Sequence, residues 1–402
     1  MNKVFVVAAK RTAVGSFLGS LKNTHPSVLG STLVKDILKS NNLTGAELDE
    51  VIMGNILSAG LGQGIARQIA VNGGVPVNVP AYSVNMLCGS AMKAVLNAYT
   101  SISSGMHNLV LAGGVESMSM APYLSPAGIR SGIKMGDVTS KDHILVDALT
   151  DAFNDVHMGI TAENIAAKHN IAREEQDVFA LESQRKAIVA IDRGRFKDEI
   201  VPIEVKVGRE TVSFADDEYP NRTTNLEKMA KLRPAFKKDG SVTAGNASGI
   251  NDGASLLLLA SEEAVKKYHL TPLAEIIGVG QAGVDPLFMG LGPVPAIDKA
   301  LKSAHLTLKD MELIELNEAF AAQSLGVLKE LSAEHGESVT DILARTNVNG
   351  GAIALGHAVG NSGSRILVTL IHEMNKRGSK LGLASLCIGG GMGTAVVLKS
   401  IK

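Results

Sequence analysis

Residues 84–92 read VNMLCGSAM, and their pattern decides which class of fold the chain is expected to adopt. The stretch from Ala81 to Val84 resembles a short buried strand, and the small residues from Gly89 to Ala91 suit the first turn of a helix. A strand that leads directly into a helix is the repeating step of folds in which strands and helices alternate. We therefore predict an α/β fold.

The same alternation extends to both sides of this stretch. Continuous apolar runs, typical of strands buried on both faces, occur at 4–8, 51–53 and 109–112. Apolar residues with helical spacing lie around and between these runs, at about 27–40, 63–72 and 88–104. The first 120 residues are therefore expected to form a layered α/β unit.

The second half of the chain repeats the first. Residues 38–40 (Leu-Lys-Ser) recur 263 positions later as residues 301–303, and Val51 is matched at the same offset by Ile314. Further along, Gly89-Ser90 is echoed by Gly363-Ser364, again before a helical pattern. A repeat of this length indicates two copies of one α/β unit rather than a solenoid.

Charged residues are distributed very unevenly along the chain. Residues 51–120 contain 3 charged residues in 70 positions, whereas residues 161–240 contain 30 in 80. The first stretch is therefore expected to be interior and the second to be solvated. We predict an N-terminal core domain (1–120 with 249–270), an inserted lid or binding domain (121–248) and a C-terminal core domain (271–402).

Composition excludes several classes of function. The 39 basic and 40 acidic residues leave a net charge of −1, so the chain as a whole has no attraction for nucleic acids or acidic membranes. Aromatic residues make up only 3%, which argues against modules that stack bases on rings. Two cysteines are too few for a disulfide scaffold or a cysteine-based zinc site, and no metal site is predicted.

No stretch resembles a membrane span or a signal sequence. The N-terminal apolar run ends after Ala9, and the longest apolar run elsewhere, Leu256 to Ala260, is far below the ~20 residues that a bilayer requires. We expect a cytoplasmic protein with reduced thiols and no membrane partner.

Two residues are the first candidates for catalysis. Cys88 is placed at the predicted start of a helix, where the helix dipole lowers the pKa of a thiol, although a buried structural cysteine is the alternative. His357 is the only titratable side chain in the glycine-rich segment 349–363, whose backbone can fold tightly around a ligand. A structural or solvated histidine is the alternative there.

Two further segments could complete such a site. Cys387 ends an apolar strand and is followed by Gly389 to Gly391, whose backbone N–H groups can bind a developing negative charge. Asn317 is placed before a helix, as an N-cap or as a residue that holds a water molecule. The glycines that follow Cys387 do not have the GxGxxG spacing of a phosphate-binding loop, and no GxxxxGK[ST] motif occurs. A thiol, a histidine, an asparagine and a second thiol together would suit covalent acyl transfer.

Five segments in the same order and with approximately the same spacing resemble the thiolase family over essentially the whole chain. They are Asn85–Ser90, Gly113–Ser119, Asn317–Phe320, Gly350–Gly363 and Cys387–Gly391. The resemblance implies a thiolase fold, with two βαβαβαββ core domains in α-β-α-β-α layers and an inserted loop domain. It also implies a homo-oligomer, expected to be a tetramer formed as a dimer of dimers, that uses coenzyme A (CoA) thioesters as substrates and needs no other cofactor.

The resemblance also implies catalytic roles. Cys88 becomes acylated, His357 activates it, and Cys387 abstracts the α-proton of the second substrate. His357 and a water molecule held by Asn317 form one oxyanion hole, and the N–H groups of Cys88 and Gly389 form the other. In this sequence Ala358 follows the histidine, where the family commonly has proline.

CoA-contacting residues are implied in the inserted region and near it. They are Leu149, His157, Met158, Arg222, Phe236, Ala244, Ser248, Met289 and Phe320. The pair His157-Met158 resembles the short-chain biosynthetic branch, and Met158 with Met289 is expected to crowd the acyl pocket. The expected reaction is the reversible condensation of two acetyl-CoA molecules through an acetyl-Cys88 intermediate.

Three alternatives stay open at this stage. A degradative thiolase would accept longer 3-ketoacyl chains. A 3-ketoacyl synthase would decarboxylate malonyl thioesters, a role for which the thiol of Cys387 is not suited. A non-catalytic acyl-CoA or lipid binder is expected to have lost one of Cys88, His357 and Cys387, and this chain has all three.

Overall fold

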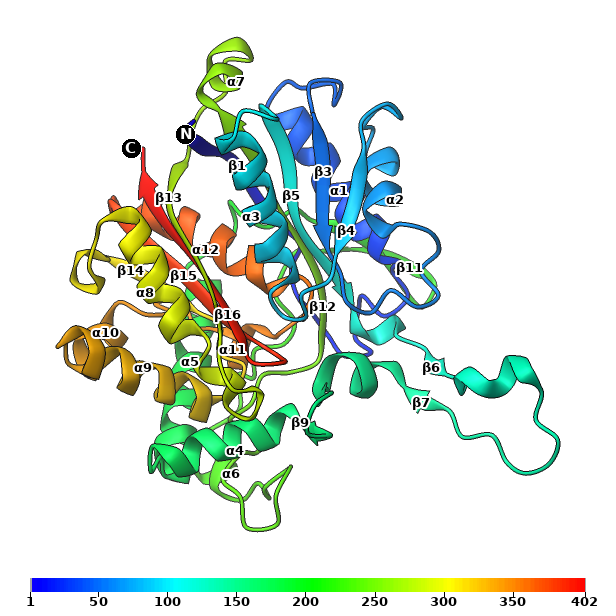
Figure 1. Ribbon diagram of the computed structural model, residues 1–402, viewed down its shortest axis with the longest axis vertical. Coiled ribbons are helices and arrows are strands. Elements are labelled where there is room, and N and C mark those ends of the chain that lie inside the picture. Colours follow the sequence, from blue (N-terminus) through cyan, green and yellow to red (C-terminus); the bar gives the residue numbers. More distant parts are fainter. Residues whose placement is uncertain (1, 402) are drawn as a thin grey trace.

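The computed structural model describes residues 2–401, and its centre is one continuous sheet (Figure 1). The strands follow the order β14-β15-β16-β13-β1-β12-β5-β3-β4, with the short β2 (Gly15–Ser16) paired to β12. The first half of the chain supplies β1 (Val4–Arg11), β3 (Glu50–Gly54), β4 (Ala81–Val84), β5 (Leu109–Ser117) and β12 (Asn251–Ser261). The second supplies β13 (Ala274–Gly283), β14 (Leu313–Leu316), β15 (Leu381–Ile388) and β16 (Met392–Ser400).

The predicted duplication is confirmed by the strand order. Counted outward from the junction, the first half reads β1-β12-β5-β3 and the second reads β13-β16-β15-β14. In both halves the two outer strands are parallel and the other pairs are antiparallel. The halves join where Phe5 and Val6 of β1 pair with Glu275 and Ala274 of β13.

The strand at the end of the first half differs from the prediction. β4 was expected to be buried on both faces, but it is the edge strand, and Tyr82 and Ser83 are exposed. An edge strand has a neighbour on one side only, so the apolar character of this short run did not reveal its position. In the second half the corresponding strand is reduced to a single bridge between Ile314 and Thr346.

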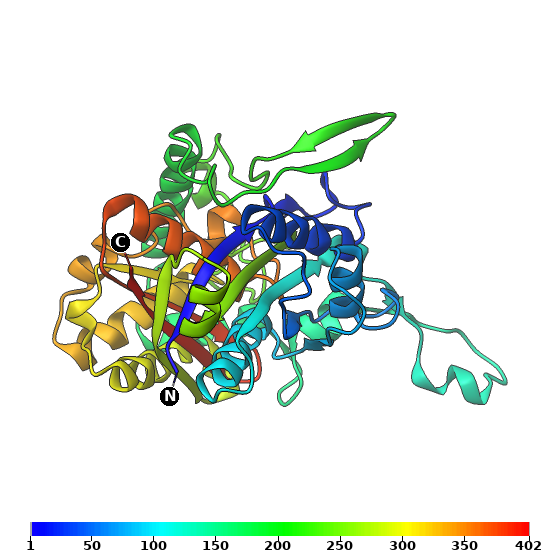
Figure 2. The same ribbon diagram turned by 90° about the horizontal axis from the view of Figure 1, so that it is seen from above.

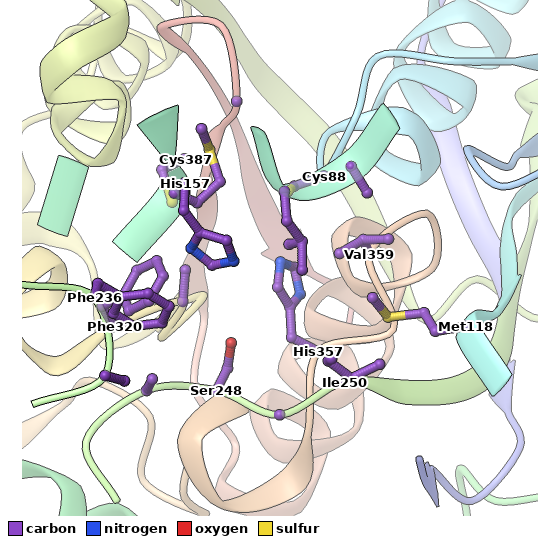
Figure 3. Close-up of a pocket in the computed structure, with 18 of the residues that line it drawn as sticks. Cys88, Met118, His157, Phe236, Ser248, Ile250, Phe320, His357, Val359 and Cys387 are labelled. Atoms are coloured by element: carbon purple, nitrogen blue, oxygen red, sulfur yellow. The ribbon is translucent and has the colours of Figure 1, made fainter. Parts of the chain in front are cut away.

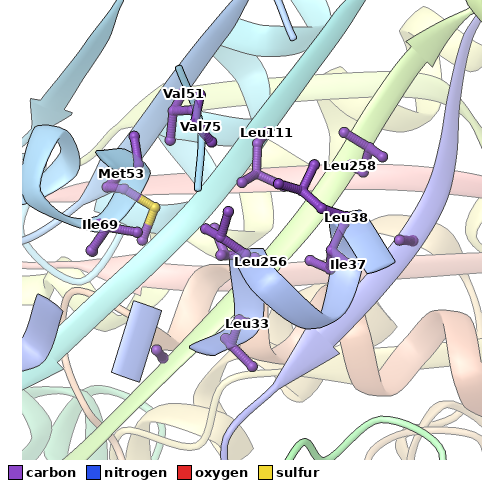
Figure 4. Close-up of a cluster of buried hydrophobic side chains, with 14 of the residues drawn as sticks. Leu33, Ile37, Leu38, Val51, Met53, Ile69, Val75, Leu111, Leu256 and Leu258 are labelled. Carbon is purple, nitrogen blue, oxygen red and sulfur yellow. The ribbon is translucent and has the colours of Figure 1, made fainter. Parts of the chain in front are cut away.

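The strands of the core are buried on both faces, as predicted. Along β12, Leu256 and Leu258 pack into one apolar cluster, while Leu257 and Leu259 pack into another on the opposite face. This alternation is the expected consequence of side chains that point to opposite faces of a sheet. Figure 4 shows Leu256 and Leu258 against helix α1 (Pro26–Ser40).

The helices divide into three layers. One outer layer holds α1 and α2 (Ile65–Asn72), which pack on the first half of the sheet. The middle layer holds α3 (Ser90–Ser103) and α12 (Ser362–Arg377), whose apolar cluster includes strands of both halves. The other outer layer holds α8 (Pro293–Ala304) and α9 (Ala321–His335). Because the helices of the middle layer contact strands of both halves, each half of the sheet forms its own β layer, and the result is the predicted α-β-α-β-α layering. The remaining helices of the two core units are α7 (Glu262–Lys267), α10 (Val339–Ala344) and α11 (Ala352–Leu355).

The predicted inserted region, 121–248, contains short elements and two longer helices. They are β6 (Tyr123–Leu124), β7 (Lys141–Asp142), β8 (Thr150–Asp151), β9 (Val156–His157), α4 (Met158–Lys168), α5 (Arg173–Asp192), β10 (Ile203–Val207), β11 (Glu210–Phe214) and α6 (Leu226–Ala230). An arm around β6 and β7 projects from the molecule (Figures 1 and 2). The precise domain boundaries stay a prediction.

The two halves approach each other closely at one end of the sheet. At Gly114, on β5, an added Cβ atom would lie 2.2 Å from the carbonyl oxygen of Gly360 in the second half. Only glycine permits this approach, because any larger residue would push the backbones apart. The strand ends after Gly54, Ser117 and Ile388 and the starts of α3 and α12 therefore come together, which is where α/β sheets usually hold their sites.

Candidate active site

A cavity of about 350 Å³ lies where the halves and the inserted region meet. Most of the predicted site residues line it: Cys88, Leu149, His157, Met158, Phe236, Ala244, Ser248, Met289, Phe320, His357, Cys387 and Gly389. Figure 3 shows Cys88, His357 and Cys387 at one cavity, with Phe236 and Phe320 on the side of His157. Residues 299 positions apart in the sequence thus share one site.

Cys88 is carried by a tightly bonded turn before α3. The Oγ of Ser90 accepts a hydrogen bond from the N–H of Met86 (2.9 Å) and donates one to the carbonyl of Leu87 (2.6 Å). The Oδ1 of Asn85 accepts from the N–H of Leu87 (3.0 Å). Leu87 has a φ of 49°, a strained left-handed conformation for a residue with a Cβ atom. The motif residues around Cys88 therefore hold the thiol in a defined position.

The predicted decrease in the pKa of Cys88 is wrong. Burial raises the pKa of the Cys88 thiol to about 11, and the charge of Glu116 adds to this rise. The neighbouring backbone N–H groups of Gly389 and of Cys88 itself lower the pKa only in part. Desolvation therefore outweighs the helix dipole, and the resting thiol is protonated and needs a base. The same two N–H groups are the pair that the sequence predicted for an oxyanion hole.

His357 is oriented by hydrogen bonds on both its backbone and its ring. Its N–H donates to the Oδ1 of Asn251 (2.9 Å), and its Nδ1 lies 2.7 Å from the Oγ of Ser362. Because the Ser362 hydroxyl donates to the carbonyl of Ala358 (3.0 Å), its oxygen is left to accept from Nδ1–H. This pattern assigns an unprotonated Nε2, which can act as a base.

The imidazole of His357 is neutral at physiological pH. Burial lowers the pKa of His357 to about 4, and the positive charge of Arg365 contributes to the decrease. A neutral imidazole beside a protonated thiol is the starting state for transfer of the thiol proton to the ring. The environment of His357 therefore supplies the base that Cys88 requires.

Asn317 lies beside His357 rather than at a helix cap. Helix α9 begins at Ala321, so the N-cap interpretation of Asn317 is wrong. The Nδ2 of Asn317 lies 3.4 Å from the Nδ1 of His357, and its buried Oδ1 has no hydrogen-bond partner among the described residues. Buried amide oxygens normally have a partner, so this atom is available to a substrate or to a water molecule.

Cys387 is the most deeply buried of the three candidate catalytic residues. It is 2% exposed near the end of β15, and burial, together with the neighbouring Cys88 thiol, raises its pKa. The chain then turns sharply through Gly390 and Gly391, which have φ values of 75° and 80°. This turn brings Gly389 to the cavity that Cys88 lines, and the N–H of Gly389 lowers the pKa of the Cys88 thiol.

Three rings form the opposite side of the cavity. The rings of His157 and Phe236 stack with their centroids 4.6 Å apart, and Phe236 meets Phe320 edge to face at 6.2 Å. An added Cβ atom at Gly159 would lie 2.2 Å from the Phe236 ring, so the glycine allows the ring to lie against α4. Met158 and Met289 belong to the adjoining apolar cluster and also line the cavity.

Arg222 is the one predicted contact residue that lies away from the other residues. It does not line the cavity, and its guanidinium bonds the Oδ1 of Asp192 at 2.6 Å while more than half exposed. A charged side chain on a turn gives no sequence signal for the direction in which it points. The structure therefore does not bring Arg222 together with the other predicted residues.

Several lining residues were not predicted from the sequence. Met118, Ile250 and Val359 form an apolar wall beside Cys88 and His357 (Figure 3). Met118 and Val359 lie within the motif segments, but nothing in their spacing distinguished them from core residues. Among residues 2–401, no three His, Cys, Asp or Glu side chains form a metal-binding group, and no helix is both long and apolar enough to span a membrane.

Comparison with known families agrees with this architecture. The model of the thiolase N-terminal domain matches residues 4–263, and that of the thiolase C-terminal domain matches residues 270–400. The chain therefore belongs to the thiolase family. With its relatives, this membership makes it an enzyme of the acyltransferase class.

The similar proteins are acyltransferases that are named for acyl-CoA substrates. An acetyl-CoA acetyltransferase of Pseudomonas aeruginosa is 52% identical over 99% of both chains, and a probable acetyl-CoA acyltransferase of Staphylococcus aureus is 49% identical over the full length of both. The structure of the Bacillus anthracis acetyl-CoA acetyltransferase is 43% identical, with a TM-score of 0.95 over 100% of this chain and 99% of that one. Human mitochondrial 3-ketoacyl-CoA thiolase in complex with CoA is 47% identical, with a TM-score of 0.93 over 99% and 98%.

Proposed function

We propose that the chain is an acetyl-CoA acetyltransferase, which condenses two acetyl-CoA molecules to acetoacetyl-CoA and CoA and also catalyses the reverse reaction. The observation that carries this proposal is the convergence of Cys88, His357 and Cys387 on one cavity, which Gly389 also lines. Three relatives that share about half of their residues with this chain are acetyl-CoA acetyltransferases, which supports the same reaction.

In the first step, Cys88 takes up the acetyl group. The Nε2 of His357 accepts the thiol proton, and the resulting thiolate attacks the thioester carbonyl of acetyl-CoA. The CoA thiolate leaves and takes the proton from His357, so the products are acetyl-Cys88 and CoA. The Cys88 thiolate replaces the CoA thiolate on the acetyl group. Because the two are similar leaving groups, this step is readily reversible.

In the second step, a carbon–carbon bond forms. His357 accepts the thiol proton of Cys387, and the resulting Cys387 thiolate takes the α-proton of a second acetyl-CoA. The enolate oxygen is stabilised by the Nε2–H of His357 and by a water molecule held by Asn317. The enolate carbon attacks the acetyl-Cys88 carbonyl, whose oxygen accepts hydrogen bonds from the N–H groups of Cys88 and Gly389. Cys88 leaves as a thiolate and takes the proton from His357, while Cys387 keeps the α-proton, so both thiols end the cycle protonated.

The cavity favours a short acyl group. Met158 and Met289 approach it from one side, and Met118 and Val359 from the other. A second candidate function, thiolysis of longer 3-ketoacyl-CoA substrates, is favoured by the similarity to the human 3-ketoacyl-CoA thiolase. Rates measured with 3-ketoacyl-CoA substrates of increasing length distinguish the two functions, because acetoacetyl-CoA should be the best substrate.

The central test uses purified protein with acetoacetyl-CoA. Consumption should require CoA and should be abolished in Cys88→Ala, because that variant cannot form the acetyl-enzyme. Cys387→Ala is the matched control, since it removes a thiol from the same cavity but should still exchange acetyl groups between acetyl-CoA and CoA. Normal turnover by Cys88→Ala would contradict the proposal.

We further propose a cytoplasmic homotetramer that needs no cofactor besides its CoA substrates. The arm from Tyr123 to Asp142 supports oligomer formation, because its exposed apolar side chains include Tyr123, Ile133 and Met135. Light scattering should give the mass of a tetramer for the whole chain and a smaller mass after removal of the arm. Turnover should persist after treatment with a metal chelator, and cell fractionation tests the location.

A further inference from the structure

Glu116 is a buried carboxylate that none of the catalytic steps uses. It lies on β5, in the motif segment Gly113–Ser119, and its side chain is 0% exposed. Its Oε1 accepts hydrogen bonds from the Nδ2 of Asn55 (2.9 Å) and the N–H of Leu57 (3.1 Å). Its Oε2 accepts from the N–H groups of Ile56 (3.0 Å) and Gly360 (3.0 Å). Four N–H donors thus saturate one carboxylate.

These bonds connect the two halves of the molecule beside the cavity. Asn55, Ile56 and Leu57 follow β3 in the first half, whereas Gly360 lies three residues after His357 in the second half. Ile56, Leu57 and Val359 belong to the apolar cluster that also contacts Cys88. Glu116 therefore sits between the segment that bears His357 and the wall of the cavity beside the nucleophile.

The fit leaves little freedom at this junction. An added Cβ atom at Gly360 would lie 2.3 Å from the Oε2 of Glu116, so the backbone of the His357 segment lies directly against the carboxylate. A carboxamide in place of the carboxylate would direct an NH2 group at N–H donors and lose the hydrogen bonds of one oxygen. The hydrogen bonds that the carboxylate accepts, rather than the space that the side chain fills, therefore keep the backbone of the His357 segment in place.

We propose that Glu116 is a positioning residue, which holds the segment from His357 to Gly360 at the distance from Cys88 that proton transfer requires. This inference rests on the roles proposed above for Cys88 and His357. Glu116 touches neither the sulfur nor the cavity lining, so it acts through the backbone of the second half. Displacement of a catalytic group by about 1 Å can cost about 100-fold in rate.

The chain contains a matched control for this role. Asp49 lies just before β3, and its Oδ2 accepts hydrogen bonds from the N–H groups of Asn108 (2.6 Å) and Leu109 (2.8 Å), at the start of β5. Asp49 thus joins the same two strands as Glu116, but at the opposite end of the sheet. Asp49→Asn removes a carboxylate that bonds backbone N–H groups without reaching the active site.

The experiment compares Glu116→Gln with Asp49→Asn and the parent enzyme. In Glu116→Gln, kcat for thiolysis of acetoacetyl-CoA should fall about 100-fold, with KM for CoA close to that of the parent, because the wall formed by Phe236 and Ser248 is unchanged. The rate of Cys88 alkylation by iodoacetamide, followed by mass spectrometry, should fall as well. Asp49→Asn should retain the kcat and alkylation rate of the parent.

A second variant keeps the test decisive if Glu116→Gln does not fold. Gly360→Ala retains the carboxylate but pushes the segment away from it, so it should reproduce the loss of kcat. Where both variants fold, the double variant should lose no more than either single variant, since both break one contact. Additive losses would contradict the proposal.

Two other results would overturn the inference. One is a kcat in Glu116→Gln equal to that of Asp49→Asn. The other is faster alkylation of Cys88 with unchanged kcat, which would mean that Glu116 acts only through its charge on the thiol. Absence of turnover in the parent enzyme would instead count against the proposed function. In that case the rates of Cys88 alkylation would still test the role of Glu116 separately.

Discussion

The two halves of the molecule have the same scaffold and carry different chemistry. The repeat offset equates Val51 with Ile314, and these residues pair with Leu111 of β5 and Leu383 of β15. Four positions further along each strand, the first half has Val115 where the second half has Cys387. The two halves thus have similar strand ends, one of which carries the thiol of Cys387 and the other the apolar side chain of Val115.

The same strand alignment equates two further pairs of positions in the two halves. The position of Glu116 in the first half corresponds to Ile388 in the second, and that of Gly54 corresponds to Asn317. In the proposed mechanism, the first half therefore contributes the nucleophile Cys88 and the buried carboxylate of Glu116. The second half contributes the base His357, the amide of Asn317 and the second thiol, Cys387. The predictions below exchange or disturb these matched positions, from the largest expected effect to the smallest.

Cys387→Val gives the second half the residue that the first half has at this position. Condensation of acetyl-CoA should fall by about 10³- to 10⁴-fold, because no group is left to take the α-proton. Exchange of acetyl groups between acetyl-CoA and CoA should continue, since it needs only Cys88 and His357. A steady-state assay of condensation and a labelled-CoA exchange assay measure the two steps separately. Equal loss of both would mean that the valine disturbs the whole cavity.

Asn317→Ala removes the amide that the first half replaces with Gly54. The expected decrease in kcat is about 10²- to 10³-fold, the usual effect of losing one donor to a developing oxyanion. KM for CoA should change little, because Asn317 does not line the cavity and is proposed to act through the water molecule that it holds. Steady-state kinetics in the thiolysis direction measure both values, and a change confined to KM would contradict the assigned role.

Gly89→Ala tests the contact between the halves beside the nucleophile. An added Cβ atom would lie 2.3 Å from the Cδ1 of Ile388, so the free energy of unfolding should fall by about 1–3 kcal/mol. Ile388→Ala removes that atom, and in the double variant part of the stability should return. Urea unfolding of the three variants measures this. If Ile388→Ala does not compensate, the strain comes from the helix start rather than from the contact.

His357→Asn should make stability less dependent on pH. The folded protein keeps His357 neutral because burial lowers its pKa to about 4, whereas in the unfolded chain the pKa is about 6.5. Between these values only the unfolded state binds the proton, so the free energy of unfolding decreases as the pH falls. From pH 7 to pH 5 the parent should lose about 2 kcal/mol more than the variant. Urea unfolding at the two pH values measures the difference.

Much of the fold was predictable because its signals are local. Apolar runs and helical spacing predicted β1, β3 and β5 and the helices near them, and the repeat predicted the second unit. The edge position of β4 was missed because four residues with an apolar first and last member do not reveal how many neighbours a strand has. The arm and the direction of Arg222 also depend on contacts that no local pattern encodes.

The candidate site was predictable in its membership but not in its electrostatics. Motif order brought Cys88, His357, Cys387 and Asn317 into one hypothesis. The helix-start argument predicted a lowered pKa for Cys88, yet burial raises it to about 11, because desolvation depends on everything packed around the sulfur. The role of Glu116 was likewise hidden, since its partners lie 60 and 244 positions away.

The sequence by itself determined the alternation of strands and helices, the duplication and the residues available for acyl transfer, because these follow from periodicity, repeats and residue type. Only the tertiary structure decided which thiol lies against which amides, which base is neutral, and how a carboxylate of one half holds a backbone segment of the other. The physical reason is that distance, desolvation and hydrogen-bond direction depend on residues far apart in the chain. Local sequence patterns carry no information about such neighbours.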